Sequence, residues 1–278
     1  MTSWIRVAPA KRPEQVPGFF FETAEAGGFC SNFNQFLYAY LYAKAEGKPL
    51  SVYDMANPVG VTFPLIKSTF VDISGIAFTD SAMPFAVSLK RSLPRIQQNA
   101  LNTPIATMRQ VAQQLFQWND AILEPLKDVI KEAKLPASFD LGIHIRVGDG
   151  IIPRAVSIDE YVRAAKKILA PLLAEKDEMN VFVMSDSSSA IEQFKKKADK
   201  AWKVYAIAAP AARQDIRATQ RARQAVYYNM MAQLLVMQSI PNIVCTFSSN
   251  VGRFLYLTVE HADKVVSLDV PRFSATVV

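Results

Sequence analysis

Short apolar runs alternate with amphipathic stretches near the start of the chain. Residues 19–21 are three phenylalanines that predict a strand, and the Gly27-Gly28 pair after them predicts a tight turn. Residues 33–45 carry apolar side chains along one side of a helix, and residues 50–53 form a second apolar run. A strand, a glycine turn, a helix and a further strand form the first part of a Rossmann-like unit.

The same alternation returns after residue 138 and is clearer there. Apolar runs that predict strands lie at 141–146, 180–184, 203–207, 243–246 and 265–268. Helical patterns lie between them at 157–173, 187–198, 213–237 and 251–258. Ser157 followed by Glu160 predicts a capping box at the start of the first of these helices. This order predicts a parallel sheet whose ligands bind at the carboxyl ends of the strands.

The stretch between these two patterns is less regular. Residues 96–102 and 108–133 predict helices, and we expect Pro125 to break or kink the second one. Residues 135–138 end the helical pattern and mark the predicted linker. The chain has 278 residues, enough for two domains. We therefore predict an α/β protein with two Rossmann-like domains, residues 1–137 and residues 138–278.

The strongest chemical signal is the segment from His144 to Asp149, which ends a predicted strand. His144 and Arg146 are two residues apart, so they point to the same face of that strand. An arginine at this position can hold a diphosphate through its planar guanidinium. A structural ion pair between Arg146 and Asp149 explains the same residues, and the segment taken alone slightly favours this interpretation.

Two further loops also follow predicted strands. Residues 245–250 place small hydroxyl side chains before a helix, where they cap the helix or bind an anion at its N-terminus. Residues 27–32 form a glycine-rich turn whose backbone amides can approach a phosphate, although a plain strand-to-helix turn explains them too. The shared position of the three segments favours a phosphate-containing ligand.

Composition narrows the class of protein. Hydrophobic residues make up 50% and charged residues 20%, which supports a packed core. The net charge of +6 is spread along the chain, and we find no nucleic-acid-binding motif, so we expect no nucleic-acid partner. The chain has two histidines without metal-ligand spacing, no Asp-x-Asp and no G-x-S-x-G. These absences argue against a metal site and against a nucleophile-elbow hydrolase.

The expected compartment is the cytoplasm. Cys30 and Cys245 are the only cysteines and lie far apart in sequence, so a disulfide framework is not expected. No leader pattern appears in residues 1–11, and no apolar stretch is long enough to cross a bilayer. We expect no membrane insertion. A bacterial cytoplasm or a virus-infected host cytoplasm suits such a chain.

Four segments together resemble the fucosyltransferase superfamily, which includes the bacterial alpha-1,2- and alpha-1,6-fucosyltransferases and the protein O-fucosyltransferases. Residues 27–36, GGFCSNFNQF, are similar to its N-terminal glycine loop, and residues 144–149, HIRVGD, to its H-x-R-x-G-D signature. Residues 183–187, VMSDS, are similar to its strand-end motif, and residues 245–253, CTFSSNVGR, to its T-F-S-S-x-x-x-R motif. Residues 55–135 carry no such motif.

The resemblance implies a GT-B fold, with two Rossmann-like domains facing a cleft and the acceptor mostly on the N-terminal one. It implies an inverting, metal-independent glycosyltransferase that needs no cofactor and transfers a sugar from a nucleotide-diphosphate sugar to a glycan or oligosaccharide acceptor. Arg146 would bind the β-phosphate, and Asp149 is the candidate general base, with Glu22 or Glu25 as weaker candidates. The implied donor-binding residues are His144 and Asp186 at the nucleoside, and Gly28, Phe29, Thr246, Ser248, Ser249 and Asn250 around the phosphates.

The sequence departs from the family pattern in ways that bear on the donor. Cys30 and Ser31 stand where Gly-Asn is frequent, and Val147 stands where many members have a second arginine. No aspartate lies near Gln233, where the family often has one that reads guanine. GDP-fucose is the first expected donor, and another nucleotide sugar such as UDP-xylose is the alternative. A non-catalytic protein that binds phosphate or nucleic acid is a third interpretation.

Overall fold

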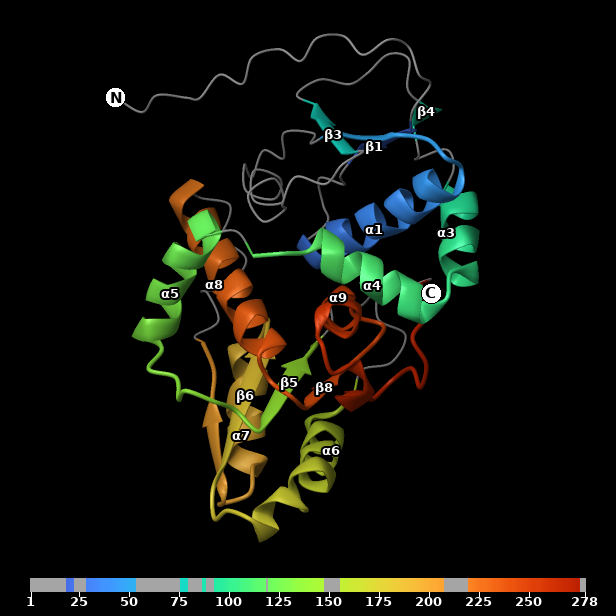
Figure 1. Cartoon of the computed structure of the whole chain (residues 1–278). Helices are drawn as coiled ribbons and strands as arrows, with labels where there is room; N and C mark the ends of the chain where they lie inside the picture. The colour runs from blue at the N-terminus through green and yellow to red at the C-terminus, as the bar shows by residue number, and fades with distance from the viewer. Residues whose placement is uncertain are drawn as a thin grey trace, which may run out of the picture.

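A computed structural model describes residues 19–22, 29–53, 76–79, 87–88, 93–118, 120–147, 156–207 and 220–275 of the chain. The fold is α/β, with one parallel sheet in each half of the sequence and helices around them (Figure 1). The predicted Asp149, Gly28 and Glu25 lie outside these residues.

The first sheet contains four short parallel strands: β1 (Phe19–Glu22), β2 (Leu50–Tyr53), β3 (Ile76–Thr79) and β4 (Val87–Ser88). They lie in the order β3-β2-β1-β4, so the chain moves outward from β1 and then returns to its other side. The apolar runs predicted β1 and β2 correctly. Nothing in the pattern indicated β3 and β4.

Helix α1 (Phe29–Ala45) begins four residues before the predicted start. Residues 29–32 therefore form the first turn of the helix, and not part of a glycine turn. The reason is packing: Phe29 and Phe33 are both buried and stack on each other with 6.4 Å between ring centroids. Both also contact the ring of Phe254, so burial of these side chains extends the helix toward the strand before it.

The middle of the chain forms three helices: α3 (Leu93–Asn102), α4 (Ile105–Leu115) and α5 (Asp120–Glu132). Pro125 lies inside α5, so the predicted break there is wrong, and the alternative of a kink stays a prediction. The helical path ends instead at Phe116, whose backbone is extended and whose side chain is buried. The indole nitrogen of Trp118 then donates to the side chain of Gln238 at 2.7 Å, which holds this corner against α8.

The second sheet has five parallel strands in the order β7-β6-β5-β8-β9. Its strands are β5 (Leu141–Ile145), β6 (Met179–Ser185), β7 (Trp202–Tyr205), β8 (Ile243–Cys245) and β9 (Val265–Ser267). Its helices are α6 (Ile158–Leu169), α7 (Ser188–Lys197), α8 (Gln220–Gln238) and α9 (Asn250–Thr258), with 3₁₀ turns η2 (Leu172–Ala174) and η4 (Ala262–Lys264). The predicted capping box of Ser157 and Glu160 is confirmed.

This strand order is that of a Rossmann unit, in which the chain runs outward from the first strand and then crosses back beside it. The crossing point lies between β5 and β8, which pair directly through Gly142 with Ile243 and Ile143 with Val244. Ligands of open parallel sheets bind outside the carboxyl ends of the strands at this point. The fold therefore directs attention to the residues that follow Ile145 and Cys245.

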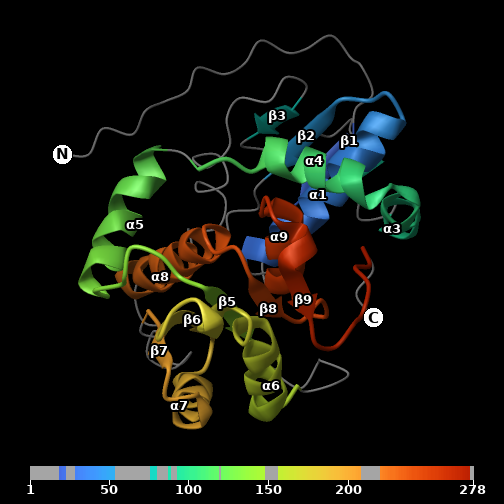
Figure 2. The same cartoon turned by 60° about the horizontal axis from the view of Figure 1, so that its bottom comes forward.

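The two halves of the chain share a hydrophobic core. One buried cluster joins α6 and α7 to the second sheet, whereas the larger cluster contains side chains from both halves. Figures 1 and 2 show α9 against α1 and α4, and α8 beside α5. The rings of Phe116 and Phe254 meet edge to face at 4.8 Å across this contact. The division at residues 137 and 138 stays a prediction, since helices from both sides of it interlock.

Arg109 on α4 closes the C-terminal end of α9. Its guanidinium donates to the backbone oxygens of Tyr256 at 3.1 Å, Val259 at 2.6 Å and Glu260 at 3.1 Å. Such carbonyls have no partner within the helix, and a cation there is favourable. We expect Arg109→Ala to lower the free energy of unfolding by about 2 kcal/mol, measured by urea titration. Arg95→Ala, on the exposed surface of α3, is the control, and equal losses in both variants would contradict this role.

Candidate active site

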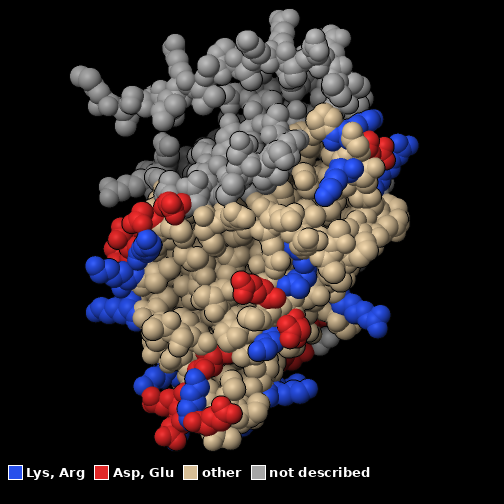
Figure 3. All heavy atoms as spheres, in the orientation of Figure 1, with Lys and Arg blue, Asp and Glu red and all other residues tan. Residues whose placement is uncertain are grey.

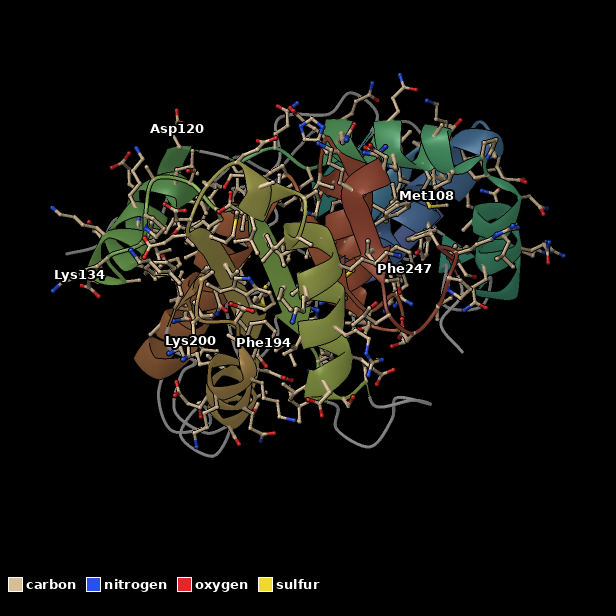
Figure 4. The ribbon with its side chains drawn as sticks, turned by 90° about the horizontal axis from the view of Figure 1, so that it is seen from below. Met108, Asp120, Lys134, Phe194, Lys200 and Phe247 are labelled. Carbon is tan, nitrogen blue, oxygen red and sulfur yellow. The ribbon has the colours of Figure 1, made fainter. Side chains whose placement is uncertain are left out.

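The described candidate residues gather at the carboxyl edge of the second sheet. The register pairs His144 with Met184 and Ile145 with Ser185, so β5 and β6 end side by side, and β8 ends on the other side of β5. This edge carries His144 near the end of β5 and the candidates that follow the three strands: Arg146, Asp186, Thr246, Ser248, Ser249 and Asn250. Figure 4 labels Phe247 in the loop after β8, on the same side of the molecule as Met108 of α4.

Arg146 forms an ion pair with Asp186, through Nη1 and Oδ2. The sequence had suggested Asp149 as the ion-pair partner of Arg146, so Asp186 was not the expected partner. The Arg146 side chain is 23% exposed and that of Asp186 is 39% exposed, so the pair remains accessible to a ligand. An ion pair this exposed contributes at most about 1 kcal/mol to stability. A ligand phosphate can therefore recruit the guanidinium at little cost.

The ends of β5 and β6 are tied together by a hydroxyl. Ser185 Oγ donates to the backbone oxygen of Ile145 at 2.9 Å and accepts from the amide of Ser187 at 3.2 Å. Ser187 in turn caps α7, because its side chain accepts from the amide of Ala190. These bonds fix the turn that carries Asp186 toward Arg146.

His144 is buried on the same strand and is held neutral. Its side chain is 4% exposed, and its Nδ1 makes no hydrogen bond with any other described residue. Burial lowers the pKa of His144 to about 4; the nearby Asp186 opposes this shift and Arg146 adds to it. A buried imidazole with an unused nitrogen is able to bind a polar group of a ligand.

This burial predicts an acid-sensitive fold. The unfolded chain takes up the His144 proton near pH 6.5, whereas the folded chain resists it down to about pH 4. The stabilisation is complete above about pH 6.5 and is lost as the pH falls toward 4. We expect a loss of about 2 kcal/mol in unfolding free energy between pH 7.5 and pH 5. Urea titration at both pH values should show this loss in the parent and in His261→Asn, which replaces an exposed histidine. A loss of the same size in His144→Asn would contradict the assignment.

Tyr161 on α6 is a site residue that sequence reasoning missed. Its side chain is fully buried, and burial raises the pKa of its hydroxyl above the ordinary value. The hydroxyl faces the backbone of Arg146 and the side chain of Thr246, in contacts looser than a full hydrogen bond. Thr246 is itself 3% exposed. Two hydroxyls are therefore buried between the ends of β5 and β8, and only the capping box of Ser157 and Glu160, just before Tyr161, pointed to this turn.

The loop from β8 to α9 is compact. Ser249 caps α9 by accepting from the amide of Val251 at 3.3 Å, which confirms the capping role predicted for this loop. The amides of Phe247 and Ser248 donate to the carboxylate of Asp269 at 2.9 and 3.1 Å. Sequence reasoning missed Asp269, since it lies 21 residues beyond Ser248 and in no motif. A protein carboxylate thus occupies two amides of the loop.

Asn250 connects the loop to the first half of the chain. Asn34 of α1 donates to the backbone oxygen of Asn250 at 3.1 Å and to its side-chain oxygen at 3.3 Å. Arg253 donates to the same side-chain oxygen at 2.5 Å and to the backbone oxygen of Phe247 at 3.2 Å. Asn34 and Arg253 are each 2% exposed, so this network is buried. It fixes the first turn of α9 against α1.

Phe29 is the remaining candidate. Its ring is 1% exposed and lies within the aromatic core, so the side chain does not reach the site. Its amide begins α1 and has no acceptor within the helix. Any contact of Phe29 with the nucleotide-sugar donor therefore comes from its backbone amide, as the resemblance implied.

Two absences apply to the described part of the chain. No group of three or more His, Cys, Asp or Glu side chains is placed to hold a metal ion there. Within the same residues, no helix combines the length and the apolar character that a membrane span requires.

Several solved structures share this fold. Fucosyltransferase NodZ from Bradyrhizobium is 14% identical, with 92% of this chain and 96% of that chain covered and a TM-score of 0.56. NodZ alpha-1,6-fucosyltransferase co-crystallised with GDP gives 14% identity, 92% and 97% coverage and a TM-score of 0.56. POFUT1 in complex with GDP gives 12% identity, 92% and 99% coverage and a TM-score of 0.50. The fold is GT-B, as predicted.

The family follows from the sequence itself. The family model for alpha-(1,6)-fucosyltransferase N- and catalytic domains matches residues 66–269, about three quarters of the chain, and the chain belongs to this family. A search of curated protein sequences gives no match. The predicted class is confirmed: the protein is a fucosyltransferase-like glycosyltransferase.

Proposed function

We propose that this protein transfers L-fucose from GDP-fucose to a glycan acceptor, with inversion at the anomeric carbon and without a metal ion. The observation that carries the proposal is the convergence of Arg146 and the N-terminus of α9 at the crossing point between β5 and β8. A guanidinium and a helix N-terminus both attract negative charge. This is the position where a GT-B enzyme of this strand order needs to hold a diphosphate.

The proposed roles follow from these contacts. Arg146 binds the β-phosphate and stabilises the charge that develops on the leaving diphosphate. The hydroxyls of Thr246, Ser248 and Ser249 and the first turn of α9 hold the phosphates, with help from the backbone amides of Gly28 and Phe29. Asp149 is the proposed general base. His144 and Asp186 take the nucleoside side.

The metal-free mechanism is a further part of the proposal. Enzymes that use a divalent ion on the diphosphate need paired carboxylates to bind it. The described residues offer Asp186 paired with Arg146, and Asp269 surrounded by hydrogen-bond donors. In both cases the carboxylate oxygens already contact a guanidinium or hydrogen-bond donors of the protein, where a metal cation would have to bind. We expect EDTA to leave the transfer rate unchanged.

The donor base is tested by ligand-dependent stability. The comparison structures include NodZ soaked with GDP-fucose and both NodZ and POFUT1 with GDP, which supports a guanine nucleotide. We expect GDP at about 100 times its Kd to stabilise the fold by about 2.7 kcal/mol, or roughly 5 °C in Tm. UDP, TDP and ADP should give smaller shifts at the same concentration. Stabilisation by UDP and not by GDP would replace GDP-fucose with a donor such as UDP-xylose.

The non-catalytic alternative predicts a different result. A protein that only binds phosphate or nucleic acid would release no GDP from GDP-fucose in the presence of glycan acceptors, and its nucleic-acid affinity would fall steeply with salt. The surface favours the enzyme: basic and acidic side chains are interspersed over the lower part of the face in Figure 3. Several lysines among the described residues are paired with carboxylates, as Lys197 is with Asp159 at 2.6 Å.

A further inference from the structure

A short segment after β9 turns back onto the loop that joins β8 to α9. Asp269 Oδ1 accepts from the amide of Phe247 at 2.9 Å, and Asp269 Oδ2 accepts from the amide of Ser248 at 3.1 Å. Two successive backbone amides that converge on one anion form the kind of nest that binds phosphate in other loops. In this protein the anion in the nest belongs to the chain.

The same carboxylate is fixed from its own side. Ser267 Oγ donates to Asp269 Oδ1 at 2.9 Å, and the amide of Val270 donates to it at 2.7 Å. The Ser248 hydroxyl lies beside it in a looser contact. Burial alone would raise the pKa of Asp269, but hydrogen bonding from Ser248, Ser267 and the amide of Phe247 outweighs burial and lowers it. Asp269 is therefore ionised and held in one position.

The other side of the loop is also occupied. Arg253 donates to the backbone oxygen of Phe247 at 3.2 Å, and the amide of Ser249 donates to the backbone oxygen of Thr246 at 3.3 Å. The loop thus has a carboxylate on its amide side and a guanidinium on its carbonyl side. Its shape is set before any ligand binds.

We propose that Asp269 is a positioning residue for the donor diphosphate: it occupies the amides of Phe247 and Ser248, and so holds the loop that presents Ser249 and α9 to that diphosphate. The inference rests on the proposed function. It goes further by adding Asp269 to the site as the residue that holds the loop, and by excluding the amides of Phe247 and Ser248 from phosphate contact.

The first test compares Asp269→Asn and Asp269→Ala with Asp263→Asn, an exposed carboxylate on η4. Asparagine offers one acceptor oxygen to two amides, so we expect GDP affinity, measured by calorimetry, to fall 10- to 100-fold. The KM for the acceptor should stay within twofold. In Asp269→Ala the amides of Phe247 and Ser248 no longer have a carboxylate between them and should bind added formate. Formate should therefore raise the GDP affinity of this variant at least threefold. Asp263→Asn should match the parent with and without formate.

A second test needs no variant and so does not depend on their folding. Hydrogen exchange of the Phe247 and Ser248 amides in the parent should be slow without nucleotide, and GDP should slow it no more than it slows a buried strand amide such as that of Val181 in β6, which reports the general stabilisation of the fold. Protection by GDP clearly beyond that of Val181 would show that these amides contact the phosphates, and would overturn the proposal. Unchanged GDP affinity in Asp269→Asn would overturn it as well. A parent that binds no nucleotide would refute the proposed function itself, and this role of Asp269 with it.

Discussion

Replacing Arg146 with alanine is expected to lower the transfer rate by a factor of about 100 to 1,000 while the protein remains folded. The size follows from the loss of one preorganised charge contact to a leaving group, which typically costs about 3 to 4 kcal/mol in the transition state. The fold should tolerate the change, since the Arg146 side chain is 23% exposed and its partner Asp186 is half-exposed. We expect the Tm to fall by no more than about 3 °C.

The measurement is kcat with saturating GDP-fucose and acceptor, together with the GDP affinity of each variant. Arg146→Lys keeps the charge and loses the planar fork, so it should retain more activity than alanine and less than the parent. Arg163→Ala, exposed on α6, is the matched control and should match the parent. Full activity in Arg146→Ala would move the diphosphate site elsewhere. If the parent binds GDP but never transfers fucose, and Arg146→Ala weakens GDP binding, the non-catalytic alternative is favoured.

The second sheet could be predicted almost strand by strand, because buried parallel strands are apolar on both faces. β5 is buried along its whole length and β6 along nearly all of it, and each is followed by a charged residue. Short apolar runs bounded by serine, glycine or aspartate were therefore a reliable signal. Helix boundaries were off by a few residues, since the last turn of a helix depends on its contacts as much as on its own sequence.

The middle of the chain could not be predicted in the same way. β4 has two residues, which is too short for a pattern to stand out, and β3 was missed although it is as long as β1 and β2. The break before α5 depends on Phe116 entering an aromatic cluster built from Phe29 and Phe254. That cluster joins residues more than 200 positions apart, and no local signal records it. Tertiary packing thus sets the break between α4 and α5, and the proline inside α5 does not.

The site residues also fall into those that the sequence predicted and those that only the structure located. His144, Arg146 and the loop that includes Ser249 follow predicted strands, so topology alone brought them to one edge. The residues that support them come from elsewhere: Asn34 bonds to Asn250 across 216 positions. Asp269 and Tyr161 likewise act through backbone groups, which leave no trace in a motif. Sequence motifs therefore located the groups that face a ligand, and the structure located those that hold them.

Helix α9 packs most closely against the loop after β8 at Gly252. A Cβ added to Gly252 would lie 2.0 Å from the backbone oxygen of Thr246 and 2.9 Å from its carbonyl carbon. Backbone atoms of a strand end cannot rotate away as a side chain can, so α9 would have to shift. We expect Gly252→Ala to lose about 3 kcal/mol or more in unfolding free energy. Since α9 and the loop move together, GDP affinity of the folded fraction should fall as well.

Two other glycines separate this effect from the general cost of replacing glycine. An added Cβ on Gly142 meets the flexible end of Met237, with Sδ at 2.8 Å, and this side chain can move aside. Gly47 has a φ of +63° and nothing within 4 Å of an added Cβ, so alanine there costs about 1 to 2 kcal/mol through backbone strain alone. Urea titration should therefore rank Gly252→Ala as the least stable of the three alanine variants. If Gly252→Ala is no less stable than Gly142→Ala, α9 does not approach Thr246 as closely as described, and the phosphate loop is free to adjust without the helix.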